Sequence, residues 1–362
     1  MSAATLTIDL SAVAENTRRF VRAGSPAVLA VVKADGFGHG LADVARTAVA
    51  NGATWIGVTS VAEGVAVRAA GVTVPVLSWL NPVQVDVPTV LRHRIDLAVP
   101  SGRHLAAIVA AEPRHPVRVH LQLDTGMARD GAAPEEWAGL MAAARRAEVA
   151  GWVTVVGVMG HLAMADRPGH PGNAQGKSAL LRGVALAEQA GLRPTLRHLA
   201  ATAATLTDPS AHLDLVRIGA GLVGIDPSGS TRLRPSLRLT APVAQVRRVG
   251  AGVGVGYGHT GVTGRPTTLA LLPLGYADGL PRSASGRAQV LVRGRRCPVI
   301  GVISMDQTVV DVGDVPVEPG DQAVLFGPGR AEPAVEEWAA WAGTIPHEIV
   351  TGIGHRVGRS VR

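Results

Sequence analysis

The 362-residue sequence predicts an α/β protein with an N-terminal (β/α)8 TIM-like barrel over residues 1–232 and a C-terminal, mostly β domain over residues 233–362. The first observation is that short apolar runs alternate with helical patterns about eight or nine times before residue 232. The second is that these runs are apolar on both faces, as in the buried strands of a parallel sheet. The third is that strand patterns separated by Gly, Pro and Asp replace the helical patterns after residue 232.

The elements of the first part follow one another in regular order. We expect strands at residues 5–10, 27–32, 53–58, 74–79, 95–99, 117–124, 152–160, 195–200 and 214–221, and helices at 11–24, 41–52, 60–71, 101–112, 134–148 and 173–191. This number of units in about 230 residues fits a closed barrel, whose sites lie at the carboxyl ends of the strands. An open doubly wound sheet remains the alternative, because periodicity alone does not close a barrel.

The second part begins after a polar, proline-containing linker at residues 228–235. Strand patterns cover residues 237–250, 267–279, 288–314 and 321–329, and a helical pattern returns at 334–343. The single cysteine, Cys297, lies in one of these strand patterns. We therefore expect a buried thiol there, and one cysteine forms neither an intrachain disulfide nor a CxxC metal site.

Composition and charge narrow the class of protein. Hydrophobic residues make up 47% and charged residues 17%, which is a globular composition. The net charge of +7 comes from scattered arginines that do not alternate with aromatic residues, so we expect no nucleic-acid partner, although a small anionic ligand fits this charge. The first 13 residues lack a signal-peptide pattern and no apolar run reaches the length of a membrane span, so the expected location is cytoplasmic, with no membrane partner and no metal.

Lys33 is the first candidate for chemistry. It follows the apolar run 27–32 and precedes the glycine-rich turn ADGFGHG, so it lies at the carboxyl end of a predicted barrel strand. Lys33 and Lys177 are the only lysines, whereas arginine is used throughout the chain. An amine can lose its proton and form a Schiff base with a carbonyl compound, and a guanidinium cannot.

The stretch VVKADGFGHG resembles the cofactor-lysine motif of alanine racemases, the pyridoxal 5′-phosphate (PLP) enzymes of the type III fold. The resemblance extends along the chain through LDTGMARDG, GVMGHLAMAD, RHLAATAAT, LVRIGAGLVG, GYGHTG, LLPLGYADGLPR, IGVISMDQ and TIPHEIVTGIGHRVGR. It implies interconversion of L- and D-alanine, which supplies D-alanine for cell-wall peptidoglycan. It also implies a homodimer with shared active sites.

The resemblance assigns the two catalytic bases. Lys33 binds PLP covalently and serves as the base on one face of the substrate, and Tyr276 serves as the acid and base on the other face. Family architecture implies that Tyr276 comes from the partner subunit. Tyr276 and Tyr257 are the only tyrosines, and Tyr257 lies in a segment that lines the entry channel in the family.

The resemblance also assigns the binding residues. Arg217 meets the pyridine nitrogen of PLP, with the histidines His198 and His161 nearby. The phosphate is bound by Thr202 and by the backbone amides of Gly219 and Ala220. Arg129 contacts the phenolic oxygen of PLP and the substrate carboxylate, which the backbone amide of Met305 from the partner subunit also meets.

Several positions depart from the family pattern. Phe37 replaces a tyrosine whose hydroxyl helps to bind the phosphate, and His355 lies near another phosphate-binding tyrosine position and can replace it as a cation. Ala201 replaces an asparagine, and Gln122 replaces a lysine that orients the arginine equivalent to Arg129. These changes, with Met164 and Val223, leave two alternatives: a racemase of serine or another small or specialised amino acid, or a PLP-binding relative of low activity.

Overall fold

The computed structural model describes residues 4–23 and 27–362. The chain forms two compact units. The barrel unit holds the described residues of 13–36 and 40–233. The C-terminal unit holds residues 234–362, the short segment 37–39 and the described residues up to Ala12.

The barrel unit is built on eight parallel strands in the order β8-β7-β6-β5-β4-β3-β2-β9. The strands are β2 (Val28–Val31), β3 (Trp55–Val58), β4 (Val76–Ser78), β5 (Ile95–Val99), β6 (Val117–Gln122), β7 (Val153–Met159), β8 (Leu196–His198) and β9 (Val216–Ile218). Backbone hydrogen bonds also join the two end strands, from Arg217 N to Ala200 O (3.0 Å) and from Asp214 N to Arg197 O (3.1 Å). The sheet is therefore closed, which confirms the barrel and excludes the open sheet.

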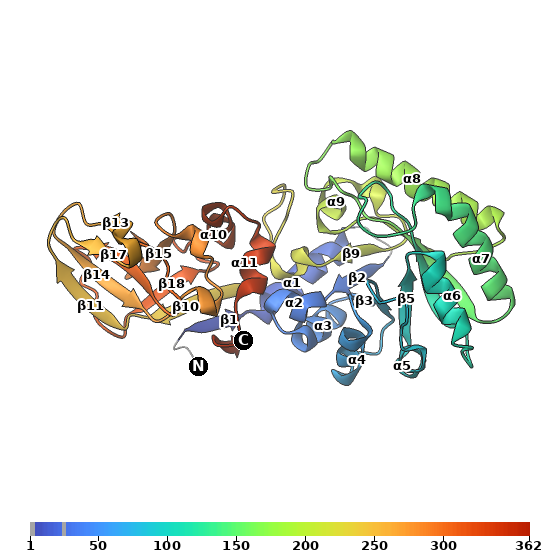
Figure 1. Cartoon of the computed structure of the whole chain (residues 1–362), viewed down its shortest axis with the longest axis horizontal. Coiled ribbons are helices and arrows are strands. Elements are labelled where there is room, and N and C mark those ends of the chain that lie inside the picture. The colour runs from blue at the N-terminus through green and yellow to red at the C-terminus, as the bar shows by residue number, and fades with distance from the viewer. Residues whose placement is uncertain (1–3, 24–26) are drawn as a thin grey trace. The chain divides into compact units, whose positions relative to one another are not determined.

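Helices connect the strands and surround the barrel (Figure 1). They are α1 (Leu10–Arg22), α2 (Lys33–Gly38), α3 (Leu41–Ala50), α4 (Val61–Ala69), α5 (Val87–Arg92), α6 (Gly102–Ala110), α7 (Trp137–Val149), α8 (Pro171–Gln189) and α9 (Thr202–Thr207), with the 3-10 helices η1 (Pro134–Glu136), η2 (Pro209–Ala211) and η3 (Ala220–Val223). Ser60, Asp86 and Ser101 cap α4, α5 and α6 by accepting hydrogen bonds from amides of the first turn, which explains where these helices begin. The expected last residue of the first helix, residue 24, lies outside the described residues.

The barrel interior combines an apolar core with an unusual set of buried polar groups. Leu29, Ile56, Leu77, Leu97 and Leu121 are fully or almost fully buried along successive strands. Fully burying one such side chain stabilises the fold by roughly 1.5–3 kcal/mol. Among them lie four buried side chains that carry charge or can do so: Asp96, His120, His198 and Arg217. Such groups are rarely buried unless they are paired, so their partners need to be identified.

The C-terminal unit contains three sheets. A six-stranded sheet has the order β16-β15-β18-β10-β1-β19, a three-stranded sheet β11-β14-β17, and a two-stranded one β12-β13. The strands are β1 (Thr5–Ile8), β10 (Leu237–Pro242), β11 (Gln245–Val249), β12 (Gly254–Val255), β13 (Gly261–Val262), β14 (Thr267–Leu272), β15 (Gln289–Val292), β16 (Arg295–Pro298), β17 (Thr308–Gly313), β18 (Gln322–Phe326) and β19 (Gly358–Val361). The helices are η4 (Tyr257–His259), η5 (Tyr276–Asp278), η6 (Arg282–Ala284), α10 (Val335–Ala342) and α11 (Pro346–Gly352).

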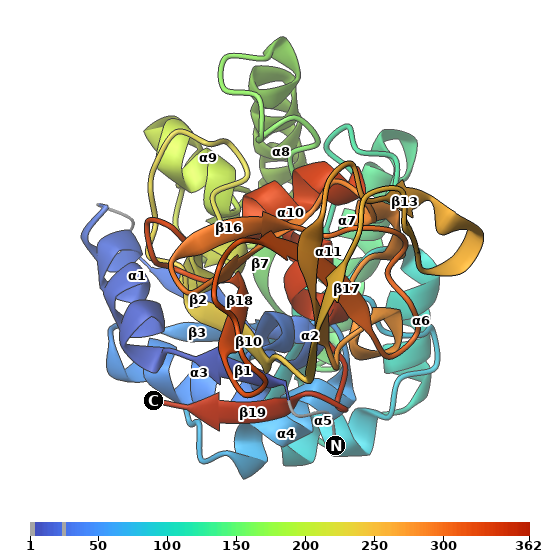
Figure 2. The same cartoon turned by 90° about the vertical axis from the view of Figure 1, so that its left-hand side faces the viewer.

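The strand β1 is not one of the eight barrel strands, and its alternation of threonine with buried apolar residues differs from the strands β2 to β5, which are buried on both faces. It pairs antiparallel with β10 and parallel with β19, so that Leu6 lies opposite Leu239 and Arg359. Figure 2 shows β1 beside β10 and β19, which come from the other end of the chain. The buried side chains of Leu6 and Ile8 thus belong to the core of the C-terminal unit.

Two further features concern the single cysteine and the length of the helices. Cys297 lies in β16 and is buried, as the sequence indicated, and burial raises the pKa of its thiol. Of the helices that the structure describes, none is both long and apolar enough to cross a membrane.

Candidate active site

Lys33 opens a left-handed turn at the carboxyl end of β2. The five residues after it, Ala34 to Gly38, have φ angles between 52° and 78°. Glycine adopts this conformation readily, but each non-glycine residue in it costs of order 1–3 kcal/mol. Hydrogen bonds maintain the turn, from Gly36 N to Val32 O (2.8 Å), from Leu41 N to Asp35 Oδ1 (2.8 Å) and from Ala34 N to Glu63 Oε1 (2.9 Å).

The surroundings of Lys33 favour its neutral amine. Burial lowers the pKa of Lys33 and the charge of Arg129 lowers it further, while Glu63 acts in the opposite direction. The Glu63 carboxylate also accepts hydrogen bonds from the amide and the hydroxyl of Thr59 (both 2.8 Å), so its second oxygen is already paired. A lysine with a lowered pKa is a better nucleophile toward a carbonyl compound.

Arg217 lies on β9 with 5% of its surface exposed. Its Nη1 donates to His198 Nδ1 (3.1 Å), and its Nη2 donates to Gly160 O (2.7 Å), Leu199 O (3.1 Å) and His161 Nδ1 (3.1 Å). Burial lowers the pKa of Arg217 to about 10, so it keeps its charge at neutral pH. The guanidinium is therefore a fixed donor in a site that excludes water.

His161 joins the groups already described. Burial, together with the charges of Arg217, Arg129 and Lys33, lowers the pKa of His161 to about 3. The imidazole is therefore neutral, and the positive charges of three neighbouring residues act on it. The structure thus brings together four of the residues predicted for the site: Lys33, Arg129, His161 and Arg217.

Thr202 and the loop before η3 form the next part of the site. Thr202 Oγ1 accepts a hydrogen bond from Gly221 N (3.1 Å), which connects α9 to η3. A Cβ at Gly221 would lie 2.5 Å from the ring of Phe20, so only glycine fits there. Gly219 and Ala220 lead into η3, whose first amides have no acceptor within the helix and are suited to an anion. Ala201, which precedes α9, provides no side-chain cap.

Arg129 lines a cavity of about 440 Å³ at the carboxyl ends of β5 and β6, beside Ser101, His104 and Asp124. Gln122 does not contact Arg129. Its Nε2 donates to Asp130 Oδ2 instead (2.9 Å). Gln122 therefore supports the loop that carries Arg129 rather than the guanidinium itself.

The remaining predicted residues belong to the C-terminal unit. Tyr276 N donates to Ser304 O (3.0 Å) and Ala277 N to Met305 O (3.0 Å), so the segments of Tyr276 and Met305 are joined through their backbones. The side chains of Tyr276 and Met305 are exposed by 41% and 52%.

The other two residues of this unit lie at different sites. Phe37 is buried with its ring centroid 6.2 Å from that of His347, so it packs in place of making a polar contact. His355 is exposed. The contributions of these four residues to the active site stay predictions.

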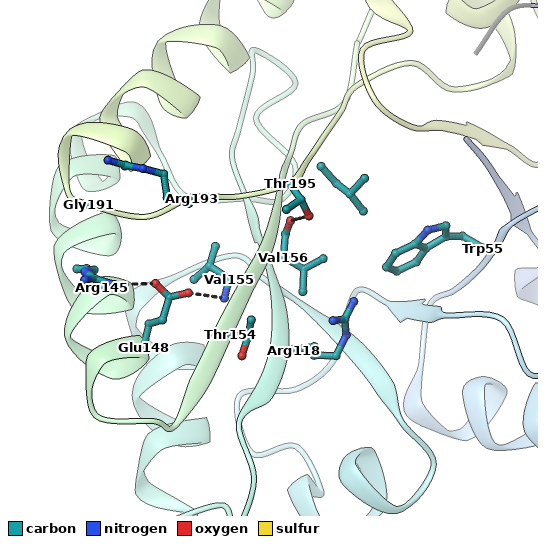
Figure 3. A pocket seen from close by; sticks show the side chains of 11 residues that line it. Trp55, Arg118, Arg145, Glu148, Thr154, Val155, Val156, Gly191, Arg193 and Thr195 are labelled. Carbon is teal, nitrogen blue, oxygen red and sulfur yellow. Dashed lines mark hydrogen bonds and ion pairs between the residues drawn. The ribbon is translucent and has the colours of Figure 1, made fainter. Parts of the chain in front are cut away.

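A second, larger cavity lies at the opposite end of the barrel (Figure 3). Its volume is about 600 Å³, and it is lined by residues near the amino ends of β3, β6, β7 and β8, among them Trp55, Arg118, Thr154 and Thr195. None of the residues predicted for the active site lines it.

The carboxyl-end residues fit the groups of PLP. Lys33 offers an amine for the aldehyde, Arg217 offers a permanent donor for the ring nitrogen, and the loop at Gly219 and Ala220 offers amides for the phosphate. A closed parallel barrel with these groups at the carboxyl ends of its strands defines the class as a barrel-type PLP enzyme.

Comparisons with known families and proteins identify the member of this class. The family model described as alanine racemase, N-terminal domain, matches residues 8–227, and that described as alanine racemase, C-terminal domain, matches residues 236–361. A protein named alanine racemase from Frankia casuarinae is 47% identical, and the match covers 97% of this chain and 94% of that protein. A protein of the same name from Thermobifida fusca is 45% identical, and the match covers 97% of this chain and 96% of that protein.

Solved structures agree with the sequence comparisons. The alanine racemase structure from Streptomyces coelicolor A3(2) has a TM-score of 0.95 at 45% identity and covers 99% of this chain and 98% of its own. The structure from Streptomyces lavendulae has a TM-score of 0.94 at 42% identity, covering 100% and 97%. The chain belongs to the alanine racemase family, and the family function is PLP-dependent isomerisation of alanine.

Sequence reasoning missed three residues that shape this site. Glu63 holds the backbone after Lys33, while Asp96 and His120 lie inside the barrel next to His198. The available signal was polar residues inside the apolar runs IDLAV and VRVHLQLD. Their partners lie on other strands, so their spacing alone did not identify them.

Proposed function

We propose that the protein interconverts L- and D-alanine with Lys33 and Tyr276 as bases on opposite faces of the substrate. The observation that carries this proposal is the Lys33 amine, whose lowered pKa accompanies a buried, permanently charged Arg217 within one cluster at the carboxyl end of the barrel. PLP, when bound, supplies the electron sink that lets Cα of alanine lose its proton.

Lys33 has two tasks in this reaction. Its Nζ would hold the cofactor, and when free it would remove the Cα proton of one enantiomer or return it to the other. Burial and the nearby Arg129 lower the pKa of Nζ, which favours the unprotonated amine that a base requires. Arg129 also meets the carboxylate of alanine, which orients Cα toward Nζ.

Arg217 determines which reaction follows proton removal. A guanidinium only donates, so the ring nitrogen that meets Arg217 accepts a hydrogen bond and carries no proton. The weaker electron sink disfavours transamination. His161 and His198 accept hydrogen bonds from Arg217 and so orient its guanidinium, and we assign neither of them a proton-transfer role.

The phosphate is assigned to Thr202 and the amides of Gly219 and Ala220. Phe37 contributes no hydroxyl to this group, and the exposed His355 is the proposed substitute as a cation. The domain boundary at residues 232 and 233 belongs to the same proposal, with the C-terminal domain completing the partner's active site through Tyr276 and Met305. The backbone bonds that join the segments of these two residues support their acting as one unit.

The biological setting is part of the proposal. The enzyme acts as a cytoplasmic homodimer that supplies D-alanine for peptidoglycan, with no nucleic-acid or membrane partner. Substrate preference is tested by incubating the PLP-loaded enzyme with a panel of L-amino acids and separating enantiomers by chiral chromatography. We expect D-alanine as the main product; faster conversion of serine or another amino acid would replace alanine as the substrate.

The shared active site can be tested by mixing two inactive variants. Lys33→Ala and Tyr276→Phe are each purified, mixed, dissociated and reassociated. If Tyr276 acts in the partner's site, half of the dimers are mixed and carry one intact site of two, so activity recovers to about a quarter of wild type. If both bases came from one chain, every site would carry a lesion and the mixture would stay inactive.

A further inference from the structure

A chain of buried polar groups crosses the interior of the barrel. Asp96 is the second residue of β5, His120 lies in the middle of β6, His198 ends β8, and Arg217 lies on β9. His120 Nε2 is 3.4 Å from Asp96 Oδ2, His120 Nδ1 is 2.9 Å from His198 Nε2, and His198 Nδ1 is 3.1 Å from Arg217 Nη1. The chain therefore leads from the amino half of the barrel to the arginine of the active site.

The donors and acceptors of this chain have only one consistent order. Arg217 can only donate, so His198 Nδ1 accepts and the proton of His198 lies on Nε2. His198 Nε2 then donates to His120 Nδ1, which leaves the proton of His120 on Nε2. That N–H faces the carboxylate of Asp96, which can only accept. The chain begins at a permanent donor and ends at a permanent acceptor.

Burial supports this order. His120 and His198 are completely buried, and burial lowers the pKa of both imidazoles, which favours the neutral rings that this order of contacts requires. The rings of His120 and His198 are nearly perpendicular, at 82°, with centroids 5.1 Å apart. The contact between His120 and Asp96 is longer than a close hydrogen bond and acts mainly between the N–H dipole and the carboxylate charge.

Neighbouring residues hold His120 and Asp96 in place. Trp55 meets the His120 ring edge to face, with centroids 5.5 Å apart. A Cβ at Gly157 would lie 2.6 Å from His120 Nδ1, so glycine is required for this ring to fit. Arg118 Nε donates to both oxygens of Asp96 (2.9 and 3.1 Å), and Arg118 and Trp55 line the amino-end cavity in Figure 3.

We propose that Asp96 and His120 are positioning residues that fix the tautomer of His198 and thereby the direction of Arg217. With Asp96 and His120 in place, His198 presents an acceptor to Arg217 and cannot present an N–H, which would repel the guanidinium. This role rests on the proposed function of Arg217 at the ring nitrogen of PLP. The proton order itself does not depend on that function.

The first experiment measures the proton order directly. The protein is labelled with 15N-histidine, and two-bond 15N–1H correlation spectra report which ring nitrogen carries the proton. His120→Phe and His198→Phe assign the two resonances, and His115→Phe, at an exposed position, is the matched control. We expect His120 and His198 in the Nε2–H form. A proton on Nδ1 of either ring, or on both nitrogens, would overturn the proposal.

The second experiment measures the consequence for the reaction. Asp96→Asn keeps the shape of the side chain but removes the terminal charge, and its melting temperature tests whether it folds. We expect pyruvate formed by transamination to increase, per racemisation turnover, by about 2- to 12-fold, as losing one hydrogen bond of this strength implies. We also expect the dissociation constant of PLP to increase. An unchanged ratio and dissociation constant in folded Asp96→Asn and His120→Phe would contradict a positioning role.

The two experiments separate the two hypotheses. A wild-type protein without racemase activity but with both histidines in the Nε2–H form would overturn the proposed function and leave the proton order standing. An active enzyme with a different tautomer would overturn only the positioning chain.

Discussion

The arginines at the two ends of the barrel differ in whether their charge is already paired. At the amino-end cavity Arg118 is paired with Asp96 and Arg145 with Glu148, and Arg193 donates to the carbonyls of Glu188 and Leu192. At the carboxyl end, within the described part of the chain, Arg129 and Arg217 form no ion pair with a carboxylate.

This difference is the reason for placing the proposed active site at the carboxyl end and not at the larger cavity. The cations at the amino end already have partners, so an anion entering there would have to replace existing contacts. At the carboxyl end the charges of Arg217, Arg129 and Lys33 lower the pKa of His161, and the charge of Arg129 lowers that of Lys33. Such a cluster gains most from binding a phosphate and a carboxylate. Uncompensated charge is therefore a better guide to this site than cavity volume.

The largest effect is expected from removing the amine of Lys33. Lys33→Ala eliminates both the cofactor bond and one base, and we expect racemisation to decrease by more than about 1,000-fold. The control is Lys177→Ala, which removes the other lysine, a residue on α8 whose Nζ contacts Ser210. Racemisation is followed from both enantiomers. Loss of activity in Lys177→Ala with full activity in Lys33→Ala would reverse the assignment.

The next effect compares one arginine from each end. Arg129→Met removes the proposed partner of the substrate carboxylate, and the loss of a charge-assisted hydrogen bond predicts a decrease in kcat/KM of roughly 10- to 150-fold. Arg145→Met, at the amino-end cavity, removes only a half-exposed pair with Glu148 and is expected to leave kcat/KM unchanged. Equal losses in the two variants would show that unpaired charge does not mark the site.

A smaller effect concerns the departure at Phe37. Phe37→Tyr restores a hydroxyl in the turn after Lys33, and a new bond to the phosphate predicts about 10-fold tighter binding of PLP. Phe37→Leu, which has no hydroxyl, is the control for changed packing. Fluorescence titration of the apoprotein measures both. An unchanged dissociation constant in the tyrosine variant would mean that residue 37 does not reach the phosphate.

The last effect is on the pH dependence of stability and does not involve the cofactor. The pKa of His161 is about 3 in the folded protein and near 6.5 in an unfolded chain, so the unfolded state binds more protons between these values. The contribution of neutral His161 is therefore present above pH 6.5 and is lost as the pH falls toward 3. We expect His161→Gln to reduce the slope of apoprotein unfolding free energy against pH in this window. An identical slope would contradict a neutral, partly buried His161.

Part of the fold was predictable because its signals are local. The alternation of apolar runs and helices predicts the barrel, and the run before Lys33 predicts that this residue ends a strand. The strand Thr5–Ile8 was also predictable as a strand, but its partners β10 and β19 lie more than 200 residues away and decide its sheet. The left-handed turn was not predictable, because Ala34, Asp35 and Phe37 disfavour it and tertiary contacts such as that from Glu63 impose it.

The candidate site divides in the same way. The motifs around Lys33, Arg129, Arg217 and Tyr276 are continuous in sequence and could be recognised. Asp96 and His120 could not, because each is a polar residue inside a strand pattern that carries no recognisable motif. The proposed role of these two residues depends on the pairing of β5 with β6 and on the contact of His120 with His198 on β8. Only the closed barrel brings these strands together.

The most direct test of the account is to find the lysine that holds the cofactor. The PLP-loaded enzyme is reduced with borohydride, which makes the lysine–cofactor bond permanent, and its peptides are analysed by mass spectrometry. Since the chain has only two lysines, only two peptides can carry the lysine–cofactor bond. We predict the added mass on the peptide that contains Lys33. Added mass on the peptide of Lys177, or on neither, would contradict the placement of the active site at the carboxyl end of β2.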